Sequence, residues 1–301
     1  MRRYIFTLLK GAAMGAADVI PGVSGGTVAF LSGIYHELVE SLRSINIDSL
    51  SLLFRGRLKE FWERINGNFL LSLFVGVAVS IFSLAPVMHY LLLEHPIALW
   101  SFFFALISAS SIIILKEVDF LKFKNSSSLL IGVLMALFIS LATPAESSEA
   151  LWFIFLSGVI AICAMILPGI SGSFILLLMG KYSYMIAALK ELNISVIVVF
   201  GLGAALGLIL FSRFLSWLLK SYYQQTISAL AGFMVGSLVK VWPWRVGRGG
   251  VIDGFDYPAL PKQYSEATGN NPQLLAALLF FLLGLLLVYG VEVARKKRET
   301  K

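Results

Sequence analysis

The sequence predicts an all-α polytopic membrane protein built as an inverted repeat, in which each unit holds one re-entrant broken helical hairpin and three transmembrane helices. The chain has 301 residues, of which 58% are hydrophobic and 14% charged, and its mean hydropathy is +0.86. Soluble domains have roughly 45–50% apolar and about 25% charged residues. Several apolar runs reach the roughly 17–25 residues that cross a bilayer as a helix. Two Pro-Gly-rich breaks also recur about half a chain apart.

The first repeat, residues 1–146, begins with a broken hairpin at 4–42. Its first helical piece ends before Pro21-Gly22-Val23-Ser24-Gly25-Gly26, and a second helical piece is expected from Thr27 to Leu42. Each piece is too short to span a bilayer at about 1.5 Å per residue. Residues 43–66 are basic and amphipathic, which is typical of a linker at the membrane interface. The predicted spans of this repeat are 68–93, 97–115 and 126–143.

The second repeat, residues 147–301, has the same order of elements. Its hairpin, 150–189, is broken at Pro168-Gly169-Ile170-Ser171-Gly172-Ser173. A polar connection at 243–272 precedes the last apolar run. The predicted spans of this repeat are 196–219, 227–242 and 273–293.

The two breaks belong to an internal repeat. Residues 18–46 align without gaps onto 165–193, with nine identities among 29 positions. Three predicted spans separate the hairpins, so the second unit is inverted relative to the first. Inverted repeats with paired Gly/Pro-interrupted segments are typical of secondary transporters, and the breaks mark the binding site. The identical pairs are Pro21/Pro168, Gly22/Gly169, Ser24/Ser171, Gly25/Gly172, Leu31/Leu178, Gly33/Gly180, Tyr35/Tyr182, Leu42/Leu189 and Asn46/Asn193.

The charges predict the orientation of the chain. The net charge of +7 suggests nucleic-acid binding at first, but Lys and Arg gather at the ends of apolar runs and in the connections. With both termini in the cytoplasm, the basic linker and the basic tail 295–298 fall on the cytoplasmic side, in line with the positive-inside rule. We therefore expect a multi-pass membrane protein that binds no nucleic acid.

The hairpin tips are the predicted binding site. Irregular backbone at membrane depth must line a wet cavity or be buried in protein. Ser24 and Ser171 are placed to cap the half-helices that follow, and helix N-termini attract phosphate or carboxylate groups. The alternative is that the glycines only allow close helix packing. The tip residues of this prediction are Pro21, Gly22, Ser24, Gly25, Gly26, Thr27, Pro168, Gly169, Ser171, Gly172 and Ser173.

Four ionisable residues complete the candidate site, since charges within apolar segments are costly and usually functional. Asp18 is predicted to be a proton or cation site or a partner for Arg, the alternative being a local helix cap. Glu37 is expected to face the cavity, although it could instead reach the interface. Arg213 is predicted to bind an anionic headgroup unless it snorkels to the interface, and Lys181 is interpreted in the same way.

The sequence contains none of the common enzyme or metal-site motifs. It lacks GxxxxGK[ST], HExxH and any Cys/His metal spacing, and its only cysteine, Cys163, lies in an apolar run. We therefore expect a protein that is not an enzyme and that holds no metal or cofactor.

The motifs carry a resemblance to a known family. The run from Gly11 to Thr27, GAAMGAADVIPGVSGGT, together with ILPGISGS at 166–173, resembles the PopT-type polyprenyl-phosphate (undecaprenyl-phosphate) transporters, formerly a bacterial domain of unknown function. The resemblance extends over essentially the whole chain. It implies a flippase of the bacterial inner membrane that returns undecaprenyl phosphate, the lipid carrier of peptidoglycan synthesis, from the outer to the cytoplasmic leaflet.

Several alternatives stay open at this point. Coupling to H⁺ or Na⁺ through Asp18 or Glu37 is a hypothesis, and the sequence allows a homo-oligomer without predicting one. A secondary transporter or channel for a small soluble anion also fits, because half-helix N-termini bind any anion. An integral-membrane enzyme acting on lipid phosphates is disfavoured by the lack of a nucleophile–base pair.

Overall fold

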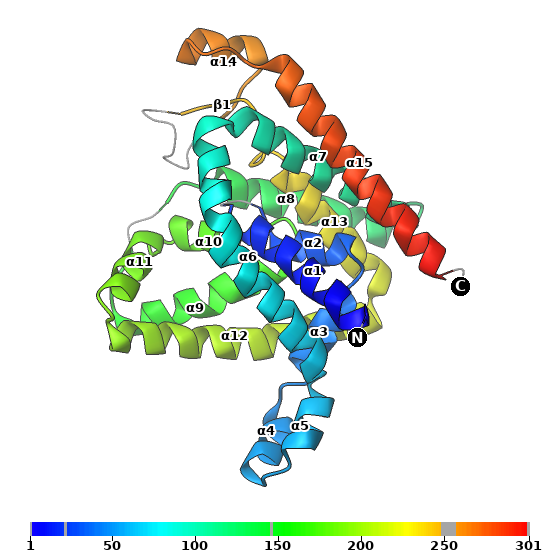
Figure 1. Ribbon diagram of the computed structural model, residues 1–301, viewed down its shortest axis with the longest axis vertical. Coiled ribbons are helices and arrows are strands. Elements are labelled where there is room, and N and C mark those ends of the chain that lie inside the picture. The colour runs from blue at the N-terminus through cyan, green and yellow to red at the C-terminus, as the bar shows by residue number, and fades with distance from the viewer. Residues whose placement is uncertain (1, 21–22, 145–146, 248–256, 300–301) are drawn as a thin grey trace. The chain divides into compact units, whose positions relative to one another are not determined.

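The computed structural model describes residues 2–20, 23–144, 147–247 and 257–299. Helices dominate this part of the chain (Figure 1). Five of the described helices contain a segment long and apolar enough to cross a bilayer, and the all-α membrane fold is thereby confirmed. These segments are Gly67–Leu84, Pro96–Leu115, Phe123–Leu141, Ile194–Ser221 and Leu274–Val293.

The chain divides into two compact units, and the first comprises residues 1–85 and 144–226. It therefore contains both predicted hairpins, one from each sequence repeat. Its boundary with the second unit falls at Pro86, inside a long helix. The helices of this unit are α1 (Arg2–Asp18), α2 (Gly25–Leu31), α3 (Tyr35–Arg43), α4 (Ile47–Phe54), α5 (Leu58–Arg64), most of α6 (Gly67–Glu94), α9 (Leu151–Ile166), α10 (Gly172–Leu178), α11 (Tyr182–Lys190) and α12 (Ile194–Ser221).

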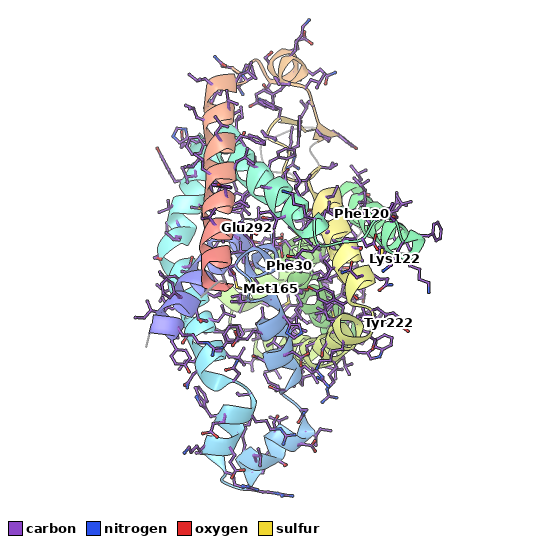
Figure 2. All side chains as sticks on the ribbon, turned by 90° about the vertical axis from the view of Figure 1, so that its right-hand side faces the viewer. Phe30, Phe120, Lys122, Met165, Tyr222 and Glu292 are labelled. Atoms are coloured by element: carbon purple, nitrogen blue, oxygen red, sulfur yellow. The ribbon has the colours of Figure 1, made fainter. Side chains whose placement is uncertain are left out.

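The second unit comprises residues 86–143 and 227–301. Glycines allow two of its helices to pack closely, since a Cβ added at Gly132 would lie 2.3 Å from the Ala229 carbonyl oxygen. The turn between the helices Pro96–Leu115 and Phe123–Leu141 exposes Phe120 and Lys122 (Figure 2). Its elements are α7 (Pro96–Leu115), α8 (Phe123–Leu141), most of α13 (Tyr223–Ser237), α14 (Pro261–Thr268), α15 (Leu274–Glu299) and the antiparallel pair β1 (Arg245–Val246) and β2 (Tyr257–Pro258).

The two hairpins have matching helix boundaries. Both α2 and α3 recur as α10 and α11 at the spacing of 147 residues that the sequence alignment predicts. Asn46 and Asn193, an identical pair of the repeat, each cap the next helix through the side-chain oxygen. The internal repeat is therefore present in the backbone as well as in the sequence.

One feature of the hairpins differs from the prediction. The returning arm is not one helix from Thr27 to Leu42, because it breaks after Leu31, and the second arm breaks in the same way with a bend of 107° between α10 and α11. Gly33 and Gly180 cause both breaks with left-handed φ values of 72° and 63°. Each glycine and the residue after it donate backbone hydrogen bonds to the preceding turn, which is the Schellman helix ending.

The hairpins pack against long helices through paired glycines. Added Cβ atoms at Gly11 on α1 and at Gly76 on α6 would lie 2.2 and 2.1 Å from carbonyl oxygens of the facing helix. Their repeat mates are Gly158 on α9, which follows Gly11 by the same 147 residues, and Gly203, which is the tenth residue of α12 as Gly76 is of α6. At these two glycines the distances are 2.3 and 2.0 Å. Small residues allow such close helix approach inside membranes. The two helix pairs thus use the same contact in both repeats.

The repeats differ most in the linker. After Asn193 the second repeat continues directly into α12, whereas the first repeat passes through α4 and α5 before α6 begins. These two short helices expose large apolar side chains, including Ile47, Phe54 and Leu58. Such exposure fits the amphipathic linker that the sequence predicts at a membrane surface.

The second repeat also departs from the expected spans near its end. In place of a span at 227–242, α13 is a helix of 15 residues that begins at Tyr223 and ends at Ser237. The connection expected to be merely polar contains α14 and the two-residue strands, and Trp242 and Trp244 each donate a side-chain hydrogen bond to a backbone carbonyl within it.

Candidate functional site

The first hairpin tip is held by two side chains. Asp18 accepts a hydrogen bond from the Gly25 N–H at 2.7 Å, and Ser24 accepts one from the Gly26 N–H at 3.1 Å. The start of α2 is therefore already capped, with a carboxylate as one of the two acceptors. This hydrogen bond is the local cap of the alternative interpretation, and a role of Asp18 as a proton or cation site stays a prediction. Pro21 and Gly22 lie outside the described residues.

The second tip has a different cap. Met165 occupies the position that corresponds to Asp18, and the Ser171 side chain makes no cap hydrogen bond within the described residues. The Ser171 hydroxyl is instead 2.8 Å from the Ser173 hydroxyl. The first N–H groups of a helix lack partners within that helix, so the start of α10 presents amides and two hydroxyls without a competing carboxylate.

The two tips contact each other within the first unit. The Ser24 hydroxyl donates to the Leu167 carbonyl at 3.1 Å, and the Gly169 N–H donates to the Thr27 hydroxyl at 2.9 Å. Gly26 allows this approach, since a Cβ there would lie 2.9 Å from the Ile166 carbonyl oxygen. Both Pro-Gly-x-Ser-Gly motifs, which are far apart in the chain, are thus joined at one place.

Pro168 and Gly172 complete the second tip. Pro168 lies in the turn after α9, and Gly172 begins α10 close to the Ala161 carbonyl. Ser24, Thr27 and Ser171 are all buried. The tips therefore form a buried polar patch between largely apolar helices.

Tyr35 is a tip contact that sequence reasoning missed. Its hydroxyl donates to the Ile166 carbonyl at 3.1 Å, and its ring is buried against Phe30. The signal was available, because Tyr35 and Tyr182 form one of the identical pairs of the repeat. Lys10 is a second such residue, since its ammonium donates to the Ser32 carbonyl at 2.6 Å and so ties α1 to the turn after α2.

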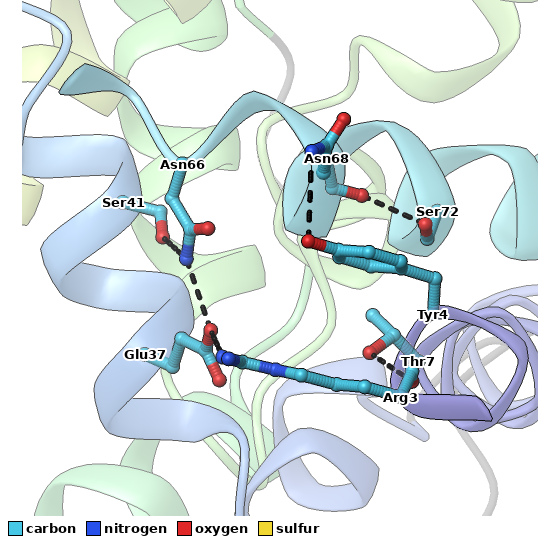
Figure 3. A network of polar contacts seen from close by, with 8 residues as sticks. All are labelled: Arg3, Tyr4, Thr7, Glu37, Ser41, Asn66, Asn68 and Ser72. Atoms are coloured by element: carbon cyan, nitrogen blue, oxygen red, sulfur yellow. Dashed lines mark hydrogen bonds and ion pairs between the residues drawn. The ribbon is translucent and has the colours of Figure 1, made fainter. Parts of the chain in front are cut away.

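Glu37 lies in the first turn of α3 and takes no part in the tip contacts. Its carboxylate pairs with the Arg3 guanidinium at 2.6 Å and accepts a hydrogen bond from the Asn66 side chain at 2.9 Å (Figure 3). The same asparagine also bonds Ser41. This network joins α1, α3 and the start of α6.

The Lys181 ammonium also has partners close to its own helix. Its ammonium donates to the Ser147 carbonyl at 3.0 Å and lies 5.7 and 5.3 Å from the ring centroids of Phe153 and Tyr184. The side chain is buried. It is part of the local packing around the start of α11.

Arg213 lies on α12 in a polar pocket with Glu40 and Lys220. Glu40 accepts hydrogen bonds from Lys220 at 2.8 Å and from Ser216. Burial raises the pKa of the Glu40 carboxyl, but the hydrogen bonds and the charge of Lys220 outweigh burial and hold the pKa at about 2. Glu40 lies in the last turn of α3, outside the membrane-length segments, and it stays ionised at neutral pH.

The described residues contain no group of three His, Cys, Asp or Glu side chains placed to hold a metal ion. Two broken helices joined at their tips, beside helices of membrane length, define a polytopic α-helical membrane protein of the transporter class. The chain matches the undecaprenyl phosphate translocase-like family over residues 14–253 and belongs to this family. The resemblance seen in the sequence is thereby confirmed. The family consists of transporters rather than enzymes.

Two relatives have names that agree with this family. The chain is 42% identical over 301 residues to the polyprenyl-phosphate transporter of Vibrio cholerae serotype O1, with 98% of each chain covered. It is 32% identical over 254 residues to the polyprenyl-phosphate transporter of Staphylococcus aureus, covering 78% of this chain and 85% of that one. No solved structure matches the chain significantly.

Proposed function

We propose that the protein carries undecaprenyl phosphate from the outer to the cytoplasmic leaflet of the bacterial inner membrane and so recycles the lipid carrier of envelope synthesis. Both termini lie in the cytoplasm in this proposal. The family and the names of both relatives support the substrate. The structural observation that carries the proposal is the hydrogen-bonded meeting of two repeat-related helix breaks.

The headgroup binds at the paired tips, chiefly at the second one. A phosphate favours helix N-termini, and the start of α10 offers amides with the Ser171 and Ser173 hydroxyls. The start of α2 already binds the Asp18 carboxylate, which repels a second anion. The prenyl tail stays in the bilayer, and alternating access comes from movement of one repeat against the other.

Replacing both hydroxyls of the second tip tests this site. Ser171→Ala/Ser173→Ala should lower transport about tenfold, because hydrogen bonds to a charged group contribute roughly 1.5–3 kcal/mol. Purified protein is reconstituted into liposomes with fluorescent undecaprenyl phosphate in one leaflet, and a membrane-impermeant quencher follows its movement. Ser183→Ala, at an exposed serine of α11, is the matched control and should transport normally.

The same liposomes separate the proposal from the alternative transporter. Fluorescent undecaprenol, which lacks the phosphate, should not be moved by the protein. Protein-dependent uptake of inorganic phosphate without any lipid movement would instead identify a soluble-anion transporter. Movement of undecaprenyl phosphate only from the cytoplasmic to the outer leaflet would contradict the proposed direction.

We further propose that Asp18 couples transport to protons. Its carboxylate makes no ion pair within the described residues, and it occupies the amides that an anion would bind. A proton on Asp18 removes this competing charge when the phosphate arrives. Glu37 is less suited to this role because Arg3 and Asn66 already bind it.

Asp18→Asn should keep downhill lipid movement but lose its stimulation by an imposed pH gradient. The amide oxygen still accepts the Gly25 hydrogen bond, whereas the titrating charge is gone. Glu37→Gln is the control and should respond to the gradient as the wild type does. The double variant Asp18→Asn/Glu37→Gln lacks both carboxylates. If it still responds normally to pH and sodium gradients, neither carboxylate couples transport.

A further inference from the structure

A cavity of about 820 Å³ opens within the first unit, far along α12 from its start. The last turn of α3, the beginning of the linker, the end of α5 and the carboxyl-terminal part of α12 form its walls. None of the tip residues lines it. Its lining residues are Glu40, Arg43, Ser44, Asn46, Ile47, Asp48, Arg64, Arg213, Ser216, Trp217, Lys220 and Ser221.

Positive charge dominates this cavity. Four cations, Arg43, Arg64, Arg213 and Lys220, face only two carboxylates, Glu40 and Asp48, which leaves a surplus of two positive charges. A phosphate monoester carries about −1.5 to −2 charges at pH 7. The cavity and such a ligand are therefore complementary in charge.

Most of the cations have partners already. Glu40 binds Lys220 at 2.8 Å and Arg43 at 3.2 Å, and Asp48 lies 3.7 Å from the Arg64 guanidinium. Arg213 differs, since it makes no hydrogen bond or ion pair with any described residue although it lines the same cavity. A guanidinium can bind two phosphate oxygens at once. Arg213 is thus the cation of this cavity that can bind a ligand without first breaking an ion pair.

The aromatic rings beside the cavity are typical of the level of the lipid headgroups. The Phe214 and Trp217 ring centroids on α12 lie 6.1 Å apart, and the ring of Tyr222, the residue after α12, lies 5.5 Å from that of Trp217. All three side chains are about half exposed. Trp and Tyr gather at membrane–water interfaces, and Trp217 itself lines the cavity. A lipid could place its phosphate in the cavity and its first apolar units against these rings.

We propose that this cavity binds the phosphate monoester of a lipid headgroup, with Arg213 as the principal cation. The site lies on the side of the basic linker, which the charge distribution predicts to be cytoplasmic, and it is separate from the hairpin tips. This proposal rests on the proposed function. It adds a second binding site for the headgroup, which the lipid occupies after it enters the cytoplasmic leaflet. Inorganic phosphate shares the same chemistry and is the other source of such a ligand.

A fluorophore in the cavity reports its occupation directly. In a Cys163→Ala background, Ser221→Cys is labelled with an environment-sensitive dye, and farnesyl phosphate, farnesol or inorganic phosphate is titrated into the protein in detergent. Arg213→Gln should weaken farnesyl phosphate binding at least about tenfold through loss of a charge-assisted contact. Arg55→Gln is the matched control, because Arg55 is an exposed linker arginine outside the cavity, and it should change the affinity less than about twofold.

Glu40→Gln should change the affinity in the opposite direction. This substitution removes a negative charge from the cavity and removes the ion pairs of Glu40 with Lys220 and Arg43. Farnesyl phosphate should therefore bind more tightly by about twofold or more. A purely structural role for both residues would weaken binding in both variants. Opposite shifts for Arg213→Gln and Glu40→Gln therefore identify direct electrostatic recognition.

The outcomes separate the two ligand sources. Farnesyl phosphate binding that inorganic phosphate does not displace supports a lipid site, whereas equal binding of both assigns the cavity to free phosphate and overturns the lipid proposal. Farnesol should not bind there. Equal affinities of Arg213→Gln and Arg55→Gln for farnesyl phosphate would overturn the proposed site.

Transport is measured independently in liposomes. A wild type that binds farnesyl phosphate at the dye but moves no undecaprenyl phosphate contradicts the proposed function and keeps the cavity site. A wild type that transports while the dye never responds contradicts the cavity site alone.

Discussion

Gly203→Ala is expected to destabilise the protein strongly, whereas Gly201→Ala, two residues earlier on the same helix, should not lower its stability. A Cβ at Gly203 would lie 2.0 Å from the Phe155 carbonyl oxygen, but nothing lies within 4 Å of a Cβ at Gly201. The obstacle is backbone, so α9 and α12 must separate. Overpacking typically costs roughly 1–3 kcal/mol, and we expect a value at or above the upper end.

Thermal unfolding of the purified protein in detergent checks this prediction. The melting temperature of Gly203→Ala should fall by at least about 5 °C, whereas that of Gly201→Ala should equal or slightly exceed that of the wild type. Gly76→Ala, at the repeat mate of Gly203, should behave as Gly203→Ala does, since its Cβ would lie 2.1 Å from the Leu8 carbonyl oxygen. Equal melting temperatures at positions 201 and 203 would mean that the close helix approach carries little stability.

The fold could be predicted from the sequence because its strongest signals are local. Apolar runs of membrane length, Pro-Gly breaks and the charge of the connections each act within a few residues. The identical pairs then predict a repeat, and features such as the caps at Asn46 and Asn193 recur in both copies. The left-handed glycines at 33 and 180 were also present in the repeat, and they would have predicted the helix endings if interpreted as C-terminal caps.

The candidate site was less predictable because its contacts are not local. Asp18 caps a helix that begins seven residues later, and the tip contacts join residues more than 140 positions apart. Nothing in the sequence pairs Arg3 with Glu37 or brings Arg213 beside Glu40. Residue type and depth indicate that a charge matters, but only the packing of the helices determines its partner.

Gly25→Ala is expected to lower lipid transport at least about tenfold while the protein still purifies as a single folded species. A Cβ at Gly25 would lie 2.4 Å from one Asp18 carboxylate oxygen and 2.9 Å from the other. The carboxylate must therefore leave the start of α2. Losing such a cap costs about 1 kcal/mol of helix stability, and the weakened turn carries Ser24 and Thr27, whose hydroxyls contact Leu167 and Gly169 of the other tip. The liposome assay with fluorescent undecaprenyl phosphate measures the loss.

A double-variant cycle shows whether the clash with Asp18 is the cause. Asp18→Ala alone should also reduce transport, because it removes the acceptor of the Gly25 N–H. In that background the alanine at position 25 meets no carboxylate, so Asp18→Ala/Gly25→Ala should transport as well as Asp18→Ala. Contacting residues typically show coupling of roughly 0.5–3 kcal/mol in such cycles. If the two losses simply add, Gly25 acts through another contact, and the tip depends on its backbone rather than on the Asp18 cap.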